Sequence, residues 1–362
     1  MSTVVFCGGT GTRAFAFELA TRLDDVTFVV NAYDDGFSTG RIRSALGVVG
    51  PSDLGKLVSV LARPAVKRWL AERSPAGTTV DGLYRWAVEA ATHVGLDGID
   101  LKRLLAYVGT FVGVLPAGFD AGDLALRNAV LTGARQQYGE GYQEALDQLG
   151  AELRLPARVV VVDEHPLRLI GVLTDGTVLR HEWQLCVRSD RAPVARVHLA
   201  AAEDPADAGV LSERVSWPAP AIAAREAVTG ADALVWAPGT LFSSLVPTAA
   251  IMAPVLRVVP AVVPRVLVAN LRQEQESTTV ARTVQALQEV VRPTLGDVRD
   301  IAQIVLCDES QRDGGGKAWG DLIPAREELL LPGCQVHYGG YELAAGVHNS
   351  PALVNDLAKF CA

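Results

Sequence analysis

The chain opens with a short apolar run that ends in a cluster of glycines. From residue 4 to residue 12 the sequence reads V-V-F-C-G-G-T-G-T, and a helix-like segment follows as far as Leu23. A strand, a glycine turn and a helix start leave free backbone N–H groups at the positive end of a helix dipole, where an anion binds well. Glycine also lets the backbone approach a phosphate without a Cβ in the way. The sequence therefore predicts a nucleotide- or phosphate-binding loop made of Gly8, Gly9, Thr10, Gly11 and Thr12.

The spacing of these glycines restricts the class of ligand only in part. The pattern G-G-x-G is neither the dinucleotide fingerprint G-x-G-x-x-G nor a P-loop, which needs a Lys-Ser/Thr pair. A tight strand-to-helix turn that binds nothing is the alternative interpretation of this loop.

Apolar runs typical of buried parallel strands recur along the chain. Val26–Asn31 is continuously apolar up to its final asparagine apart from one threonine, as in strands buried on both faces of a sheet. Helix-like segments separate the runs. Because no repeat or interdomain linker is evident, we expect residues 1–362 to form a single α/β domain with a mainly parallel sheet. The other expected strands of this core are Thr3–Cys7, Arg158–Asp163, Ala233–Ala237, Arg265–Ala269, Ile301–Cys307 and Cys334–Tyr338.

Two regions depart from the alternation of strand and helix. Residues 64–115 carry apolar side chains at helical spacing throughout, which predicts a helical insertion or cap. Leu167–Leu173 and Thr177–Leu185 flank a Thr-Asp-Gly turn and predict an antiparallel hairpin, to which Ala192–Leu199 adds a strand. Between these regions, Gly122–Tyr138 is expected to form a helix.

The composition excludes several classes of function. Hydrophobic residues make up 49% of the chain, which suits a large core, and the net charge of -8 argues against non-specific nucleic-acid binding. Five cysteines without a C-x-x-C pair indicate neither a disulfide framework nor a thiolate zinc site. The chain shows no signal-peptide pattern and no apolar stretch of membrane-spanning length. We therefore expect a cytoplasmic protein without nucleic-acid or membrane partners.

Acidic and basic residues gather after the second apolar run. Asp34, Asp35, Arg41 and Arg43 follow it directly, and Asp53 comes soon after. Carboxylates at the edge of a sheet suit a hard divalent cation such as Mg²⁺, and arginine grips phosphate bidentately. We expect Asp34, Asp35 and Asp53 to bind the metal and, with Arg41 and Arg43, to form the catalytic group. The alternative is that Asp34 and Asp35 only form a turn and that Asp53 caps a helix.

A further loop repeats the logic of the first. Residues 238–244, P-G-T-L-F-S-S, follow an apolar strand and offer N–H groups and hydroxyls at a helix start. Ordinary helix capping, worth about 1 kcal/mol, is the alternative interpretation. Together with Ser38 and Asn128, the predicted nucleotide-binding residues in this part of the chain are Gly239, Thr240, Ser243 and Asn270.

As a set, these motifs resemble the CofD/YvcK family. The matching segments are the G-G-x-G loop, D-D-G-F-S-T-G-R-I-R at residues 34–43 and P-S-D-L at residues 51–54. Residues 122–129, with Asn128, are similar to the family's G-N-L helix, residues 238–244 to its P-G-S-L-Y-T-S loop, and residues 348–354 to its C-terminal H-[DN]-x-x-x-[LV] segment. The matches occur in the same order and extend over nearly the whole chain.

This resemblance implies a Rossmann-like core and one of two activities. CofD-type enzymes transfer a phospholactyl or phosphoenolpyruvyl group from a guanosine-diphosphate-activated donor to a deazaflavin hydroxyl, with a divalent metal and release of GMP. YvcK-type proteins bind nucleotide sugars and act as regulators. The motif wording is nearer to YvcK, but Phe37 stands where that pattern has glycine, and Gly55 and Lys56 replace its Arg and Asn. The N-L-M-T-Q segment also differs after Asn270.

We therefore carry two main hypotheses forward. The first is an Mg²⁺-assisted transferase that uses a guanine or uridine nucleotide-linked donor and a hydroxyl acceptor, a deazaflavin or another compound. The second is a non-catalytic regulator that binds a nucleotide sugar through the same loops. A dinucleotide-dependent oxidoreductase is disfavoured, because only Asp34 is placed to bind a ribose in the manner of such enzymes. A homodimer is compatible with each hypothesis.

Overall fold

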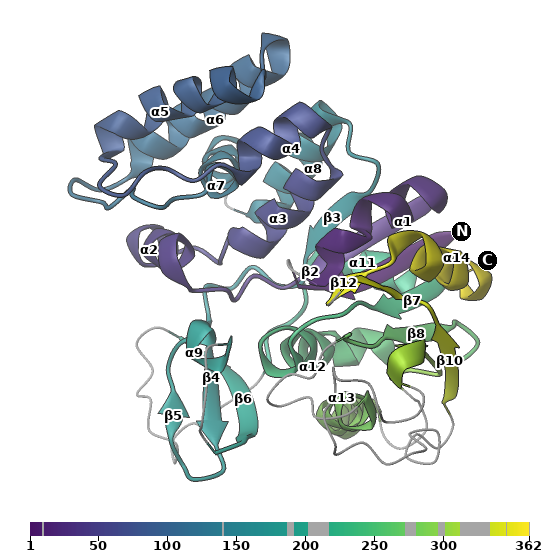
Figure 1. Ribbon diagram of the computed structural model, residues 1–362. Coiled ribbons are helices and arrows are strands. Elements are labelled where there is room, and N and C mark those ends of the chain that lie inside the picture. Colours follow the sequence, from purple (N-terminus) through teal and green to yellow (C-terminus); the bar gives the residue numbers. More distant parts are fainter. Residues whose placement is uncertain are drawn as a thin grey trace.

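The computed structural model describes residues 1–8, 11–139, 141–186, 192–201, 217–271, 280–295, 301–311, 334–344 and 346–361. Its centre is a seven-stranded parallel sheet in the order β10-β9-β8-β7-β1-β2-β3 (Figure 1). Each strand lies where the apolar runs predict one, so the expected α/β Rossmann-like core is confirmed. The strands are β1 Ser2–Cys7, β2 Asp25–Val30, β3 Arg158–Val161, β7 Ala233–Trp236, β8 Arg265–Val268, β9 Ile304–Asp308 and β10 Gln335–Gly339.

Helices cover both faces of this sheet. Successive side chains of a strand point to opposite faces, so Val5 and Cys7 contribute to one apolar cluster, whereas Val4 and Phe6 contribute to the other. The first cluster includes side chains of α1 Ala16–Arg22, α3 Ser52–Leu61, α8 Tyr142–Leu153 and α14 Ser350–Phe360. The second includes side chains of α11 Ile222–Thr229, α12 Val246–Leu256 and α13 Val280–Leu295.

The order of the strands brings two distant loops together. The chain runs outward from β1 to β3 and then returns to β7, on the other side of β1. The loops after β1 and β7 therefore emerge side by side at the point where the strand order reverses, which is where ligands of open α/β sheets bind. They touch closely: a Cβ on Gly11 would overlap the carbonyl oxygen of Pro238, and one on Gly8 would overlap Oγ of Ser244.

A helical region stands above the sheet in Figure 1. The predicted insertion contains three helices, α4 Pro64–Ala71, α5 Val80–Val94 and α6 Gly98–Val114. The next helix, α7, spans Leu126–Tyr138 and starts later than expected, because residues 122–123 form a turn with Asp123 in a left-handed conformation and Ala125 forms a β-bridge with Arg73. A further helix that the sequence analysis missed, α2, covers Phe37–Leu46.

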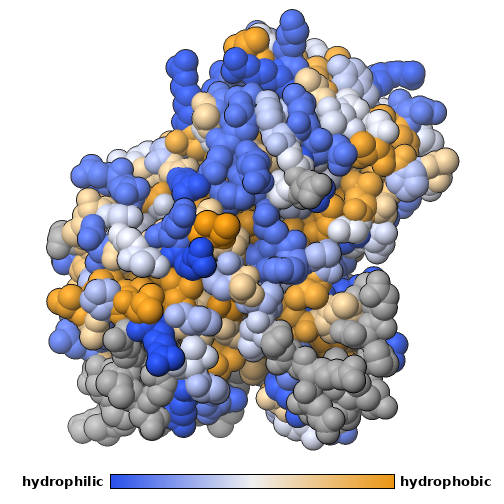
Figure 2. Space-filling model, turned by 180° about the vertical axis from the view of Figure 1, so that it is seen from behind, coloured by the Kyte–Doolittle hydropathy of each residue, from blue (hydrophilic) through white to orange (hydrophobic). Residues whose placement is uncertain are grey.

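The antiparallel hairpin is present but shorter than predicted. It forms a separate lobe with the strand order β5-β4-β6, and Figure 2 shows this lobe projecting from the body when the molecule is seen from behind. Its second strand ends early because Gln184 accepts hydrogen bonds from the backbone N–H groups of Arg180 and His181 and so favours a helical turn. The elements are β4 Arg168–Leu173, β5 Val178–Leu179, α9 Glu182–Cys186 and β6 Val194–Ala200.

Two short elements complete the described part of the chain. The strands β11 Glu342–Ala344 and β12 Val347–His348 form a small antiparallel pair just before α14. None of the helices built from described residues combines the length and apolar character that crossing a membrane requires.

The contact between α6 and α7 yields a stability prediction. A Cβ on Gly133 would overlap the carbonyl oxygen of Tyr107, so Gly133→Ala forces the two helices apart. We expect a loss of about 1–3 kcal/mol in the free energy of unfolding, measured by urea denaturation. The control is Gly113→Ala on α6, where a Cβ meets nothing within 4 Å. That substitution should gain up to about 1 kcal/mol, and equal effects of the two changes would contradict this packing argument.

Candidate functional site

A cavity of ≈ 490 Å³ lies at the carboxyl ends of the central strands, and we call it the loop cavity. The loops after β1, β2 and β7 contribute to its wall, as do α2, α3, α7 and α9. Ten of the residues predicted from sequence line it together: Gly8, Gly11, Asp34, Ser38, Asp53, Asn128, Gly239, Thr240, Ser243 and Asn270. Thr12 is fully buried beside it without forming part of the wall, and Gly9 and Thr10 lie outside the described residues.

Side-chain amides hold the loops of this cavity in place. Asn31, at the end of β2, donates to the carbonyl oxygen of Ser244 at 3.2 Å, and Asn270 donates to that of Gly239 at 3.0 Å. Thr240 and Ser243 share a hydrogen bond between their hydroxyls at the start of a short π-helix, Leu241–Leu245. The loop after β7 is thus tied to the carboxyl ends of β2 and β8, and its hydroxyls stay at the cavity wall.

Three carboxylates face the loop cavity. Asp34 and Asp53 come from the predicted acidic loop and the first turn of α3, and Glu182 comes from α9 in the antiparallel lobe. Burial, and after it the charge of Asp53, raises the pKa of Asp34. Burial, and after it the charge of Asp34, raises the pKa of Glu182 from 4.5 to about 7. The cavity therefore concentrates negative charge that solvent does not fully screen.

Lys56 lies between the two aspartates. Its Nζ is 2.7 Å from Oδ1 of Asp53 and 4.0 Å from Oδ2 of Asp34. No group of three or more His, Cys, Asp or Glu side chains in the described ranges is arranged to hold a metal ion. Mg²⁺ is commonly bound by one or two carboxylates together with phosphate oxygens and water. Asp34 and Asp53 fit that type of site, in which the nucleotide supplies the remaining ligands.

Two arginines supply positive charge to the wall of the loop cavity. Arg127 lies in the first turn of α7, and its aliphatic stem packs against Gly55. Gly55 is the residue that replaces the arginine of the YvcK pattern. Burial, followed by the charges of Arg73 and Arg13, lowers the pKa of Arg127 to about 10. Its Nε is buried and has no hydrogen-bond partner among the described residues. Arg73 lines the same wall but is held by a bidentate ion pair with Asp123, at 2.5 and 2.8 Å.

Asn128 adds an unsatisfied acceptor to this wall. The residue is buried, and its Nδ2 donates weakly to Oγ1 of Thr39 at 3.4 Å. Its Oδ1 has no donor in the part of the chain that the structure describes. A buried acceptor without a donor is costly, so this oxygen is suited to a donor from a ligand, such as a ribose hydroxyl or a base N–H group.

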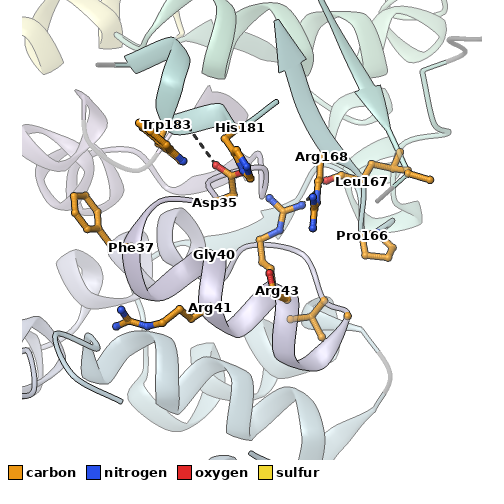
Figure 3. Close-up of a pocket in the computed structure, with 14 residues that line it drawn as sticks. Asp35, Phe37, Gly40, Arg41, Arg43, Pro166, Leu167, Arg168, His181 and Trp183 are labelled. Carbon is orange, nitrogen blue, oxygen red and sulfur yellow. Dashed lines mark hydrogen bonds and ion pairs between the residues drawn. The ribbon is translucent and has the colours of Figure 1, made fainter. Parts of the chain in front are cut away.

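The other predicted charged residues line a second cavity, of ≈ 630 Å³, which we call the basic cavity (Figure 3). Asp35 is held there by Nδ1 of His181 at 2.9 Å and by the backbone N–H of Trp183. Arg43 is buried and donates to the carbonyl oxygens of Tyr33, Asp34 and Leu167. Arg41 turns away toward Asp120, at 3.2 Å. Asp35, Arg41 and Arg43 thus line the basic cavity, whereas Asp34 and Asp53 line the loop cavity, and the catalytic role of all five stays a prediction.

Several residues of the loop cavity escaped the sequence analysis. Lys56 lies three residues after Asp53, and Arg127 directly precedes Asn128. Because both stand close to predicted binding residues, the sequence could have identified them as candidates. Glu182 and Trp183 come from the antiparallel lobe, and no motif marks them. Their presence in the wall depends on where that lobe packs against the sheet.

The raised pKa of Glu182 predicts how stability depends on pH. Between about pH 4.5 and pH 7 the folded protein keeps the proton that the unfolded chain has already released, so stability falls as the pH rises through this window. Glu182→Gln removes this loss. We expect the variant to melt at a higher temperature than the parent protein at pH 8, with the gap closing toward pH 4.5 and below. Glu89→Gln, on an exposed helix surface, is the control, and a gap of equal size at both pH values would contradict the assignment.

Comparisons with known proteins agree with this fold and set of motifs. A gluconeogenesis factor of Listeria monocytogenes is 24% identical over 74% of this chain and 66% of its own length. A Deinococcus radiodurans protein, provisionally named a gluconeogenesis factor, is 29% identical over 77% of this chain. That match spans only 48% of the Deinococcus protein. The chain therefore corresponds to about half to two thirds of the length of these relatives.

The solved structures give the same picture at the level of the fold. A crystal structure of a UPF0052 family member from Bacillus halodurans superposes with a TM-score of 0.70 at 18% sequence identity, over 99% of both chains. At the level of the family, the model described as 2-phospho-L-lactate transferase CofD matches residues 3–316. The chain therefore belongs to the CofD family.

Proposed function

We propose that the protein is a nucleotide-binding transferase that moves a phospho-acid group to an acceptor hydroxyl. The donor is a nucleoside diphosphate that carries a phospholactyl- or phosphoenolpyruvyl-type acid. The observation that supports this most strongly is the guanidinium of Arg127, which lines a cavity between two loops rich in N–H and hydroxyl donors and has no acidic partner among the described residues. A diphosphate satisfies all of these donors at once.

In the proposed reaction the acceptor hydroxyl attacks the phosphorus that carries the acid. A new P–O bond forms, and the bond between that phosphorus and the oxygen that bridges it to the nucleoside monophosphate breaks. The monophosphate leaves with the bonding electrons, and the hydroxyl proton passes to a carboxylate of the cavity. Catalysis of this kind depends mainly on positioning and on stabilising charge.

The residues of the loop cavity divide this work. The loop that includes Gly8 and Gly11, together with Thr240 and Ser243, holds the diphosphate, and Arg127 balances the charge that develops on the transferred group. Asn128 accepts a hydrogen bond from the nucleoside. An Mg²⁺ ion held by Asp34 and Asp53 would neutralise phosphate charge when bound with the nucleotide.

The names of the relatives favour a second candidate function. The Listeria protein is called a gluconeogenesis factor rather than a transferase. In addition, the ammonium of Lys56 already lies beside both carboxylates that the metal would use. A regulator that binds a nucleotide sugar through the same loops, without chemistry, fits these two observations.

A turnover assay separates the two functions. We expect release of GMP when the protein is incubated with a guanosine-diphosphate-linked phospholactate or phosphoenolpyruvate, Mg²⁺ and a deazaflavin acceptor. Asp53→Asn should lower turnover by about 100-fold or more while GDP binding changes little. The matched control is Asp81→Asn, because Asp81 is an exposed aspartate in the first turn of α5. Tight binding of a UDP-sugar without turnover of any donor in a panel would contradict the transferase function and support the regulator.

Binding by Arg127 is tested separately from catalysis. Arg127→Met keeps much of the stem that packs on Gly55 but removes a buried charge, so we expect GDP binding to weaken by about 10- to 100-fold, measured by calorimetry. Thermal stability should stay equal or rise, because the variant no longer buries a cation without a partner. Undiminished GDP affinity would show that the diphosphate binds elsewhere.

A further inference from the structure

The basic cavity adjoins the loop cavity but has a different chemical character. It lies between α2 and the antiparallel lobe, and Figure 3 shows the side chains of Arg43 and Arg168 meeting at its centre. Phe37 and Trp183 line both cavities, so a ligand in one lies next to a ligand in the other. The nucleotide proposed for the loop cavity does not account for this second space.

Positive charge exceeds negative charge among the residues that line the basic cavity, because three arginines accompany the single carboxylate of Asp35. Arg168, at the start of β4, is half-buried and forms no ion pair within the described ranges of the chain. Arg43 donates its hydrogen bonds to backbone carbonyls, and burial lowers the pKa of its guanidinium although the charges of Asp35 and Asp34 act in the opposite direction. The carboxylate of Asp35 is already engaged by His181 and by the backbone of Trp183. Arg168 is therefore the guanidinium of this cavity that an anionic ligand can pair with.

Two exposed aromatic side chains stand at the boundary between the cavities. Phe37 is 83% exposed and Trp183 is 44% exposed, and the indole of Trp183 stacks on the ring of His181 at 6.2 Å. Phe37 also has a φ of +44°, at the position where the family pattern has glycine. A bulky residue in this conformation costs about 1–2 kcal/mol. Strain together with an exposed ring points to a role in binding rather than in folding.

We propose that the basic cavity binds the acceptor and that the acceptor is an anion with a flat ring. A carboxylate or phosphate of the acceptor pairs with Arg168, beside the buried charge of Arg43, and the ring packs against Phe37 and Trp183. This places the other end of the molecule at the junction with the loop cavity, where the hydroxyl meets the donor. The identity of the ligand as acceptor rests on the proposed function, whereas the anion site rests on the cavity alone.

Calorimetric titration with 1-naphthyl phosphate tests the anion site. This probe should bind more tightly than either 1-naphthol or inorganic phosphate, because only it carries both ring and anion. Arg168→Ala should weaken its binding by about tenfold or more, as expected for the loss of a charge-assisted hydrogen bond. Arg180→Ala, which removes an exposed arginine of the same lobe, should leave binding unchanged. Absence of binding, or binding that Arg168→Ala does not weaken, overturns the inference.

The aromatic part is tested with Phe37→Gly. This change removes both the ring and the unfavourable φ, so 1-naphthyl phosphate should bind less tightly while affinity for inorganic phosphate stays the same. The melting temperature should rise or stay constant, which a purely structural role of Phe37 does not predict. Unchanged naphthyl phosphate binding would remove the ring contact from the proposal.

Titration with GDP on the same variants keeps the two proposals apart. Arg127→Met should lose GDP binding and keep naphthyl phosphate binding, and Arg168→Ala should do the reverse. If GDP fails to bind the parent protein while naphthyl phosphate still depends on Arg168, the proposed transfer reaction fails and the anion site stands. If both ligands depend on Arg127 and neither depends on Arg168, the basic cavity is not a binding site.

Discussion

The close contact between two backbone loops at the middle of the parallel sheet determines the rest of the site. The loops after β1 and β7 meet because the chain leaves β1 in one direction and returns beside it from the other. Their approach is so tight that Gly8 and Gly11 have no room for a Cβ against Ser244 and Pro238. The N–H groups and hydroxyls of both loops consequently line one cavity. The charged side chains of the loop cavity surround these two loops.

Charge balance in the loop cavity follows from burial. Asp34 and Glu182 are held in a space where ionisation is costly, and Arg127 faces them with a lowered pKa of its own. The positive charge of Lys56 compensates the charge of Asp53 and part of the charge of Asp34. Burying these charges is costly, and under the proposed function a phosphate group would pair with the arginine and a cation with the acids.

The antiparallel lobe gives the site its second half. Through α9 it contributes Glu182 to the loop cavity and Trp183 to both cavities, and through β4 it contributes Arg168 to the basic cavity. Asp35 joins the lobe to the loop after β2 by its bonds to His181 and Trp183. Adjacent aspartates thus have different roles, with Asp34 facing the nucleotide-sized space and Asp35 holding the lobe in position.

The sequence by itself determined the seven strands, the glycine loops at their ends and the family. These features depend on local signals: continuous apolar runs, glycines and fixed motif spacing. Because carboxyl ends of parallel strands share one edge, most of the predicted binding residues converged as expected. Only the tertiary structure decided which charges face the loop cavity. Arg43 and Asp35 bind backbone and lobe instead, whereas Arg127 and Glu182 line the cavity, because the direction of a long polar side chain depends on partners that packing brings from distant parts of the chain.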